Sequence, residues 1–368
     1  MEIAHPPPSA QRTERVGTVV IGAGQAGLAV GYHLAARDVD FVVLERAPRI
    51  GDGWRRRWDS LRLFTPAAYS GLPGTPFPAP PGHLPDKDEV ADYLERYAER
   101  FDLPVRLSTP VDALGWDGAR FVLESGHARF EADNVVVATG PFQRPRVPAV
   151  AARLAPDILQ LHSSEYRGPL GLPDGPALVV GAGNSGAQIA MELARSRTVW
   201  LAGRETGRLP RRILGKDVYD WLWPLLSRLT LDTRLGRRLR DRARRGDPLV
   251  GIPERSLQAS GVQRVGRLTD EHGGRPVCEG EEVAPRVVVW CTGFGPDYRW
   301  IGLPVLDEDG QPRHRRGVST DIPGLYFVGL RFQYRMTSAL LGGVGEDAAF
   351  VAGEVARRSE RAGSPLSV

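Results

Sequence analysis

The fold is decided by a stretch that reads TVVIGAGQAG at residues 18–27 and is repeated as ALVVGAGNSG at residues 177–186. In both places a continuous apolar run enters a glycine turn, and a helical pattern follows, over residues 28–36 and 187–194. Two more apolar runs end in glycine, at residues 135–140 and 287–293. Continuous runs of this kind suit strands buried on both faces of a parallel sheet. The sequence therefore predicts the α/β class, built from repeated strand–turn–helix units.

The first turn has the spacing of a dinucleotide-binding site. Gly22 permits the tight turn, Gly24 lets the backbone approach a pyrophosphate, and Gly27 allows close packing of helix on strand. The helix N-terminus then presents N–H groups and the positive end of its dipole to the phosphates. Glu45 follows Gly27 by eighteen residues, at the end of an apolar strand. A carboxylate there accepts hydrogen bonds from an adenosine ribose, so we expect this unit to bind FAD.

The second turn differs from the first at its ribose end. Eighteen residues after Gly186, the same count reaches Arg204 instead of an acid. A ribose 2′-phosphate is repelled by a carboxylate and bound by a guanidinium, so the second unit is predicted to take NADPH. Arg208, Arg211 and Arg212 follow in the same loop. Because Glu205 is the next residue and suits a 2′-hydroxyl, use of NADH stays open.

Length and spacing together predict the domain organisation. A chain of 368 residues corresponds to about two domains. We expect two Rossmann-type dinucleotide-binding domains, the second inserted into the first. The FAD-binding domain would comprise residues 16–150 and 285–368, and the NADP-binding domain residues 151–284. Residues 1–15 are polar and proline-rich and are expected to form a flexible tail.

Composition excludes several classes of protein. No apolar run reaches the eighteen residues of a membrane span, and no secretory signal is recognisable, so a cytoplasmic location is expected. Cys278 and Cys291 are the only cysteines, thirteen residues apart, which fits neither a zinc site nor a C-x-x-C dithiol. The segment from Arg234 to Arg245 holds seven arginines, although the net charge is only +4. We interpret it as a solvated helix face near a phosphorylated cofactor, with contact to nucleic acid or an anionic membrane as the alternative.

From Val19 to about Val355 the chain resembles the flavin-containing monooxygenases, which are class B flavoprotein monooxygenases. The motifs that carry the resemblance are, in order, the first GxGxxG turn, HSSEY at residues 162–166, the second GxGxxG turn, and CTGF at residues 291–294. IGDGW at residues 50–54 looks like the segment that passes the flavin diphosphate, and LPR at 209–211 resembles a stretch after the NADP strand. The chain departs from the family where Pro156 and Ile158 replace a leading F-x-G.

Motif and resemblance together give a set of expected cofactor-binding residues, with no metal site and no assigned catalytic residue. His162 is expected to be a packed, hydrogen-bonded linker residue rather than a catalyst, and Trp54 and Trp58 either to stack near the flavin or simply to pack. The expected cofactor-binding residues are Gly22, Gly24, Gln25, Ala26, Gly27, Glu45, Gly53, Trp54, Ala138, Thr139, Gly140, Gly181, Gly183, Asn184, Ser185, Gly186, Arg204, Thr292, Gly293 and Gly329.

The resemblance implies a monooxygenase that uses FAD, NADPH and dioxygen. NADPH would reduce the flavin, dioxygen would form a flavin C4a-hydroperoxide, and nitrogen or sulfur of a small nucleophilic substrate would take an oxygen atom. Alternatives are a Baeyer–Villiger-type oxygenase, whose motif usually has tryptophan where Tyr166 stands, an NAD(P)H oxidase or dehydrogenase, and a redox-sensing flavoprotein partner. A homodimer is possible, and neither nucleic acid nor a membrane span is expected.

Overall fold

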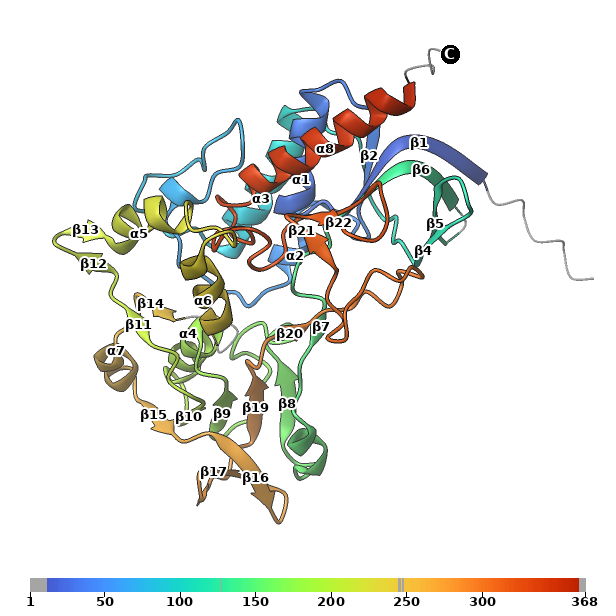
Figure 1. The fold of residues 1–368 in the computed structure, drawn as a ribbon. Coiled ribbons are helices and arrows are strands. Elements are labelled where there is room, and N and C mark those ends of the chain that lie inside the picture. Colours follow the sequence, from blue (N-terminus) through green and yellow to red (C-terminus); the bar gives the residue numbers. More distant parts are fainter. Residues whose placement is uncertain (1–11, 127, 244–245, 247, 364–368) are drawn as a thin grey trace, which may run out of the picture.

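The computed structural model describes residues 12–363 except 127, 244–245 and 247. Two large sheets organise these residues, one above the other in Figure 1, and the remaining strands form small sheets of two or three strands. The larger sheet has the order β21-β22-β23-β6-β1-β2-β3, with β4 and β5 continuing from β6, and its strands β23, β6, β1, β2 and β3 run parallel. Its strands are β1 (Arg12–Ile21), β2 (Phe41–Leu44), β3 (Val105–Arg106), β4 (Ala113–Trp116), β5 (Phe121–Ser125), β6 (Ala128–Val137), β21 (His314–Arg315), β22 (Val318–Ser319) and β23 (Leu325–Phe327).

Three helices cover one face of this sheet: α1 (Gln25–Ala35), α3 (Lys87–Arg100) and α8 (Gly345–Gly363). Alternate residues of the central strands point to opposite faces, as the two-residue period of a strand requires. Val20 and Val43 therefore pack with the helices, while Val19 and Val42 join a second core with β4–β6. Burial on both faces explains why the central strands are apolar without interruption.

The smaller sheet is wholly parallel, with the order β15-β10-β9-β19-β8. It consists of β8 (Leu159–His162), β9 (Ala177–Val180), β10 (Val199–Ala202), β15 (Val262–Val265) and β19 (Val287–Trp290), accompanied by α4 (Asn184–Leu193) and α7 (Glu254–Ala259). The remaining elements are α2 (Asp52–Arg55), η1 (Ala67–Tyr69), β7 (Arg144–Pro145), η2 (Ala149–Arg153), β11 (Arg208–Leu209), β12 (Arg212–Ile213), β13 (Lys216–Asp217), α5 (Val218–Leu226), α6 (Arg234–Ala243), β14 (Leu249–Val250), β16 (Leu268–His272), β17 (Arg275–Cys278), β18 (Glu281–Glu282) and β20 (Phe294–Gly295).

The α/β class and the parallel sheets agree with the sequence analysis, but two boundaries do not. Strand β1 begins at Arg12 and pairs with β6 from its first residue. The prediction of a flexible tail over residues 1–15 is therefore wrong for residues 12–15. Residues 1–11 lie outside the described part of the chain. Charged residues mislead here because this end of the strand lies at the surface, where Arg15 pairs with Glu131 at 3.1 Å.

The second boundary concerns strand β19. It lies between β9 and β8 in the smaller sheet. The prediction that the chain returns to the FAD-binding domain at residue 285 is therefore wrong for this strand. An apolar strand buried on both faces suits either sheet, and its sequence does not say which one it joins. The chain passes between the two sheets at β7 and β20, which pair antiparallel, and the Arg146 N–H donates to the Gly293 carbonyl at 2.9 Å.

Both glycine turns have the same close contact between helix and strand. A Cβ atom on Gly27 would lie 1.8 Å from the Gly22 carbonyl oxygen, and one on Gly186 would lie 1.7 Å from the Gly181 carbonyl oxygen. The residues that precede the helices, Gly24 and Gly183, have open space at their Cβ positions. Packing therefore requires glycine at the third position of each motif, and leaves the second position facing a void.

We predict that Gly186→Ala destabilises the protein while Gly183→Ala leaves its stability nearly unchanged. Forcing a methyl group against backbone that cannot move should cost about 2 kcal/mol or more, which corresponds to roughly 4–8 °C in the midpoint of thermal unfolding. Thermal unfolding of the two variants beside the wild type measures this difference. Equal midpoints for both variants would contradict the close contact.

Candidate functional site

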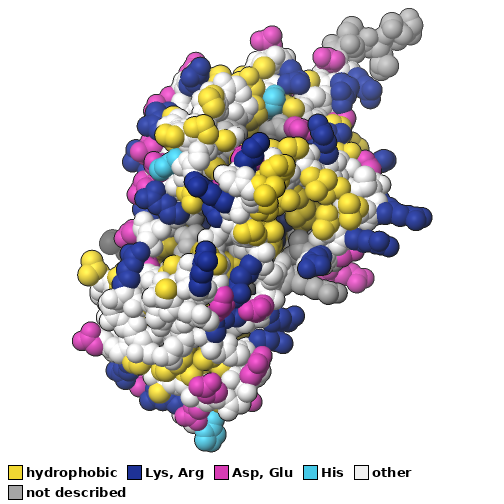
Figure 2. All heavy atoms as spheres, turned by 90° about the vertical axis from the view of Figure 1, so that its left-hand side faces the viewer, with side chains coloured by type: hydrophobic (Ala, Val, Ile, Leu, Met, Phe, Trp, Pro, Cys, Tyr) yellow, Lys and Arg dark blue, Asp and Glu magenta, His cyan; other side chains and the backbone are white. Residues whose placement is uncertain are grey.

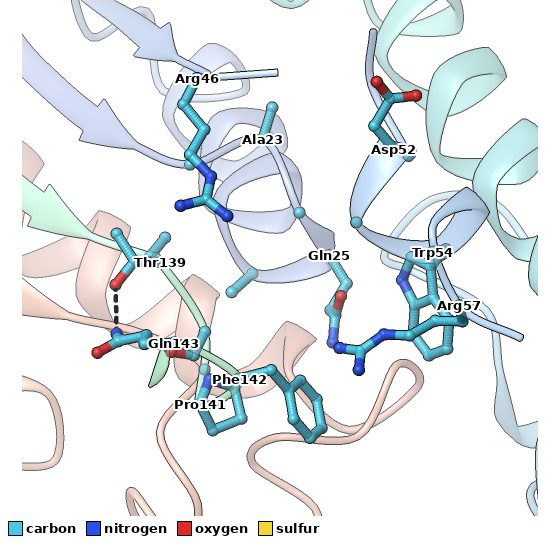
Figure 3. Close-up of a pocket in the computed structure, with 18 of the residues that line it drawn as sticks. Ala23, Gln25, Arg46, Asp52, Trp54, Arg57, Thr139, Pro141, Phe142 and Gln143 are labelled. Atoms are coloured by element: carbon cyan, nitrogen blue, oxygen red, sulfur yellow. Dashed lines mark hydrogen bonds between the residues drawn. The ribbon is translucent and has the colours of Figure 1, made fainter. Parts of the chain in front are cut away.

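A cavity of about 610 Å³ lies where the first glycine turn faces the beginning of α4. Its wall is built from the first turn, residues between 44 and 64, residues 138–143 and the first turn of α4. Figure 3 shows residues of the first three of these segments. Thirteen of the sequence-predicted residues line it: Gly22, Gly24, Gln25, Ala26, Glu45, Gly53, Trp54, Ala138, Thr139, Gly140, Asn184, Ser185 and Gly329. A volume of this size is typical of sites for small molecules and cofactors.

Glu45 holds the first turn in place. Its carboxylate accepts hydrogen bonds from the N–H of Ala23 at 2.7 Å and from the N–H of Ala47 at 2.9 Å, one on each oxygen. A carboxylate oxygen can accept a further hydrogen bond, and Glu45 also lines the cavity. The residue therefore fixes the turn and can still receive the hydroxyls of a ribose.

The turn itself leaves room for phosphates. Gly24 precedes α1 in an extended conformation, and no side chain caps the helix N-terminus. A Cβ atom on Gly24 would meet nothing within 4 Å, so the space beside its backbone is open. Gly329, which follows β23 and has φ of +84°, lies against Ala26 of α1. A Cβ atom on Gly329 would lie 2.8 Å from the Cβ of Ala26. An uncapped helix end beside open space is a ready binding place for an anion.

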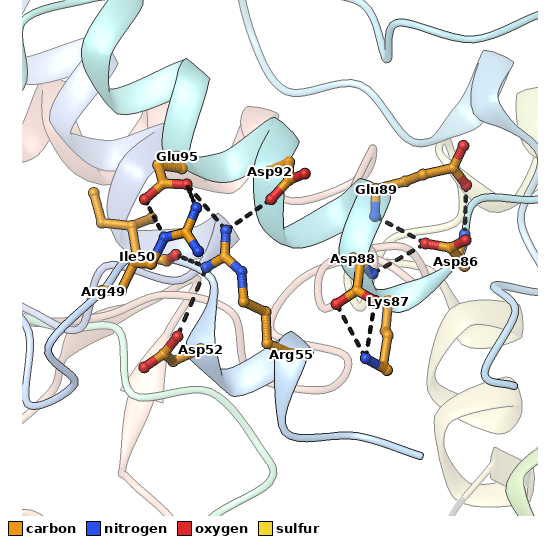
Figure 4. A network of polar contacts seen from close by, with 10 residues as sticks. All are labelled: Arg49, Ile50, Asp52, Arg55, Asp86, Lys87, Asp88, Glu89, Asp92 and Glu95. Carbon is orange, nitrogen blue, oxygen red and sulfur yellow. Dashed lines mark hydrogen bonds and ion pairs between the residues drawn. The ribbon is translucent and has the colours of Figure 1, made fainter. Parts of the chain in front are cut away.

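A network of ion pairs fixes the segment after Glu45 (Figure 4). The Arg55 guanidinium binds Asp92 at 2.8 Å and Glu95 at 3.0 Å on α3, and it donates to the carbonyl of Ile50 at 2.5 Å. Arg49 makes two further bonds to Glu95, both of 2.6 Å, and these hold the pKa of the Glu95 carboxyl below its usual range. The short helix α2 is thereby anchored to α3, which sets the position of Trp54 in the cavity wall.

Arg57 is a cavity residue that the sequence analysis missed. Its guanidinium carbon lies 4.9 Å from the ring centre of Phe142 and 5.3 Å from that of Phe294, and burial lowers its pKa. Figure 3 shows the side chain of Gln25 directed toward it. Three arginines stand in a row at 55–57, and only the turn of α2 decides that Arg55 faces α3 while Arg57 faces the cavity. Sequence alone carries no signal for that choice.

Gln143 is a second residue that was missed. Its amide nitrogen donates to the Thr139 hydroxyl at 2.8 Å and to the Gly140 carbonyl at 2.9 Å, and its amide oxygen accepts from the Asp297 N–H. It therefore joins the loop after β6 to the chain that returns from the smaller sheet. A lone glutamine in a loop gives no sequence signal for this role.

The second glycine turn contributes only its helix to this cavity. Asn184 and Ser185 line the wall, but Gly181, Gly183 and Gly186 do not. The Asn184 side chain is engaged elsewhere, because it donates to the Pro248 carbonyl at 3.1 Å and accepts from the Val250 N–H at 2.9 Å. At Asn184, helix α4 therefore presents its backbone to the cavity.

Arg204 lies outside the main cavity, exposed, in a shallow hollow with Arg208 and Arg264. Arg208 is held by Glu205 at 2.9 Å and by Glu254, and Arg264 donates to the Gly203 carbonyl at 3.1 Å. Arg204 has no carboxylate partner among the described residues. Of the basic groups in this hollow, Arg204 is therefore the one whose guanidinium is available to a ligand.

Thr292 and Gly293 lie in the crossing between the sheets and do not line the cavity. The Thr292 hydroxyl donates to the Arg146 carbonyl, and the Gly293 carbonyl accepts from His162 Nε2 at 3.1 Å. Because a carbonyl only accepts, Nε2 carries the proton and Nδ1 accepts from the Ser164 N–H at 3.2 Å. Burial lowers the pKa of His162. The structure therefore agrees that His162 is a packed linker residue.

Of the other groups singled out from the sequence, Tyr166 and Cys278 are buried and Cys291 is half-buried. Tyr166 is fully buried and its hydroxyl donates to Glu192 at 2.8 Å. Both cysteines are free, and burial raises the pKa of Cys278 to about 11 and of Cys291 to about 12. Neither thiol has the thiolate character that dithiol chemistry needs. No cluster of metal-ligating side chains is found within the described residues, nor does any helix there have the length and apolarity to cross a membrane.

Known proteins of similar sequence and structure are flavin- and nicotinamide-dependent oxidoreductases. Residues 19–235 match the family described as pyridine nucleotide-disulphide oxidoreductase. A CzcO-like oxidoreductase of Geobacillus kaustophilus is 42% identical over 92% of this chain and 98% of its own. An indole-3-pyruvate monooxygenase of Oryza sativa is 36% identical over 59% of this chain and 54% of its own. The solved flavin-containing monooxygenase of Stenotrophomonas maltophilia superposes with a TM-score of 0.78 at 28% identity, covering 94% of this chain and 99% of that one.

The chain belongs to the pyridine nucleotide-disulphide oxidoreductase family, among its flavin-monooxygenase-like members. It is an enzyme, an oxidoreductase that uses a flavin and a nicotinamide cofactor. The family inferred from the four sequence motifs is thereby confirmed.

We predict that Gly24→Val folds and loses its flavin. The valine side chain would occupy the open space beside the turn and block approach of the pyrophosphate, and its Cβ would meet no protein atom within 4 Å. The absorbance of bound flavin after purification measures the loss, and circular dichroism checks the fold. Gly183→Val is the matched control, since its Cβ position is equally open, and it should keep its flavin. A folded Gly24→Val protein with full flavin absorbance, or loss of flavin from the control, would overturn the assignment of this turn.

Proposed function

We propose that the protein is an FAD- and NADPH-dependent monooxygenase that transfers one oxygen atom of dioxygen to nitrogen or sulfur of a small nucleophilic substrate. The observation that carries this proposal is the single cavity into which two glycine-turn helices, α1 and α4, direct their N-termini. Helix N-termini favour phosphates, so the arrangement suits two dinucleotides whose reactive ends meet in one space.

The residues of the chain have positioning roles in this proposal. The turn at Gly22–Gly27 holds the FAD pyrophosphate, Glu45 the ribose, and the α4 turn the NADPH pyrophosphate. When bound, the flavin supplies hydride acceptance and activation of dioxygen, which is cofactor chemistry. Trp54 and Phe142 contribute apolar surface to the cavity wall, which a bound cofactor would cover. The hydroperoxide route implied by the family resemblance stays a prediction.

The two sheets suggest how the domains are divided. We propose that the larger sheet is the core of an FAD-binding Rossmann domain and the smaller sheet that of an inserted NADP-binding one. The boundaries expected from sequence then move to the crossing strands, near residue 144 on the way out and residue 295 on the way back. This division places β19 with the fingerprint that it pairs with.

Two other activities have less support. A dithiol–disulfide reductase, already disfavoured by the cysteine spacing, would need reactive thiols, whereas Cys278 is buried, Cys291 is half-buried and both have raised pKa values. A Baeyer–Villiger-type oxygenase is disfavoured by Tyr166, which stands where that class usually has tryptophan and is bonded to Glu192. An NAD(P)H oxidase or a redox-sensing partner differs from a monooxygenase only in the fate of the oxygen.

The decisive experiment follows that oxygen. The holoenzyme is incubated with NADPH and ¹⁸O₂ and with one of three probes: methyl phenyl sulfide, trimethylamine or phenylacetone. We expect sulfoxide or N-oxide carrying one ¹⁸O atom, in proportion to the NADPH consumed. Hydrogen peroxide without labelled product would identify an oxidase, and labelled ester from the ketone alone would identify a Baeyer–Villiger enzyme.

We predict that Arg204→Ala raises the Michaelis constant for NADPH by roughly ten- to a hundredfold and leaves that for NADH nearly unchanged. A guanidinium–phosphate contact contributes about 1.5–3 kcal/mol, and NADH lacks the phosphate. Steady-state flavin reduction with both cofactors measures the two constants. Arg212→Ala serves as the control, because Arg212 is an exposed arginine of strand β12 that does not line the hollow around Arg204. Equal losses with both cofactors, or none, would remove Arg204 from the site.

A further inference from the structure

A basic and apolar face lies on the segment from Arg211 to Arg242, which the proposed function does not use. This segment comprises the β12–β13 hairpin, α5 and α6. It holds nine basic and four acidic residues, so its net positive charge exceeds the +4 of the whole chain. Figure 2 shows the side of the molecule on which these elements lie, with hydrophobic side chains gathered in one patch and Lys and Arg side chains around it.

The apolar part of the face projects outward. Leu214 at the tip of the hairpin is 88% exposed, and its φ of +51° lies in the left-handed region that a turn of this kind requires. The Trp221 ring is 47% exposed and its Nε1 donates to the Ile213 carbonyl at 3.1 Å, which joins α5 to the hairpin. Leu225 lies one turn further along α5, on the same side as Trp221, and is 52% exposed. A patch of this kind marks an interaction surface.

Helix α6 adds charge next to this patch. Leu235 and Leu239 are four residues apart and therefore share one side of the helix, and Leu235 is 53% exposed. Arg234, Arg238 and Arg242 are exposed and have no carboxylate partner within the described part of the chain. Arg244 and Arg245 of the sequence run lie outside the described residues. A basic helix with leucines along one side is the pattern of helices that lie on membrane surfaces.

We propose that the Arg211–Arg242 face docks on the surface of an anionic lipid bilayer, with Leu214 and Trp221 inserted at the level of the headgroups. Both halves of the face fit this occupant: the arginines complement anionic headgroups, and the leucines and tryptophan find an apolar phase below them. A nucleic acid would satisfy the arginines but leave the apolar tip in water. A second copy placed symmetrically on this face would bring its positive charges together, which opposes the contact.

The docked face would adjoin the wall of the cavity. Trp223 and Tyr219 of α5 pack against Tyr69, with ring centres 5.1 and 6.1 Å apart, and Phe64 belongs to the same apolar cluster. Phe64 also lines the cavity, and its carbonyl accepts from Arg211 at 2.7 Å. Docking would therefore place the cavity wall near the bilayer, a suitable arrangement for a poorly water-soluble substrate; this consequence alone rests on the proposed function.

Flotation of the holoprotein with vesicles tests the proposal. Vesicles of phosphatidylcholine with phosphatidylglycerol should carry the wild-type protein upward at low salt, and vesicles of phosphatidylcholine alone should carry much less. The double variant Leu214→Ser/Leu235→Ser should bind the anionic vesicles at least about tenfold more weakly, since each lost leucine removes a buried apolar side chain. Leu170→Ser is the matched control, because Leu170 is 95% exposed on another loop.

A second variant tests the electrostatic contribution to vesicle binding. Arg234→Gln/Arg238→Gln should weaken binding by roughly tenfold at low salt and much less at high salt, since each basic residue near an anionic surface contributes a modest, screened attraction. Thermal unfolding checks that the variants fold. Absence of wild-type binding, or equal binding by the leucine variant and the wild type, would overturn the proposal. A wild-type dimer that Leu214→Ser/Leu235→Ser converts to monomer would instead assign the face to a second copy.

Discussion

The site depends on how closely a helix can approach the strand that precedes it. At Gly27 and Gly186 the backbone of the helix lies so near the carbonyl of the turn that a Cβ atom would stand 1.8 or 1.7 Å from it. This contact brings the uncapped N-termini of α1 and α4 to the carboxyl ends of their strands. The open space beside Gly24 and Gly183 exists only because the third glycine of each motif permits that approach. The cavity follows from this arrangement rather than from any particular lining side chain.

A second constraint orients the two units toward each other. The chain crosses twice between the sheets, and the crossings are tied by the β7–β20 pair and by the bond between His162 and the Gly293 carbonyl. Gln143 adds a third tie, from the loop after β6 to Asp297. These contacts engage His162 and Gly293 away from the cavity, whereas Ser163 and Phe294 of the same two motifs line it. The contacts hold the two halves of the cavity in register, which is a positioning role.

The sequence was informative where local geometry decides the structure. Glycine spacing identified both turns, and the eighteen-residue offset identified Glu45, whose carboxylate does hold the first turn. It was uninformative where the outcome depends on the partner. The polar residues 12–15 gave no sign of pairing with β6, and the apolar strand β19 fits either sheet. The three arginines at 55–57 differ in role because the orientation of α2 directs Arg55 toward α3 and Arg57 toward the cavity. Long-range pairing of this kind is invisible to periodicity, because the same pattern satisfies several neighbours.

The charges that line the cavity show what the protein contributes to the chemistry. Each carboxylate among the described lining residues is already engaged: Glu45 by two N–H groups, Asp52 by Arg55, Asp112 by the Gly126 N–H and Asp297 by Arg299. The Arg299 bond also holds the pKa of the Asp297 carboxyl below its usual range. Arg57, by contrast, lies against the rings of Phe142 and Phe294, and no ion pair of its guanidinium with a carboxylate is found among the described residues. A site whose carboxylates each have a donor partner and whose wall also carries arginines is better suited to holding anions than to transferring protons. Its physical design is therefore that of a holder for phosphorylated cofactors, which leaves the bond-making chemistry to the groups that it binds.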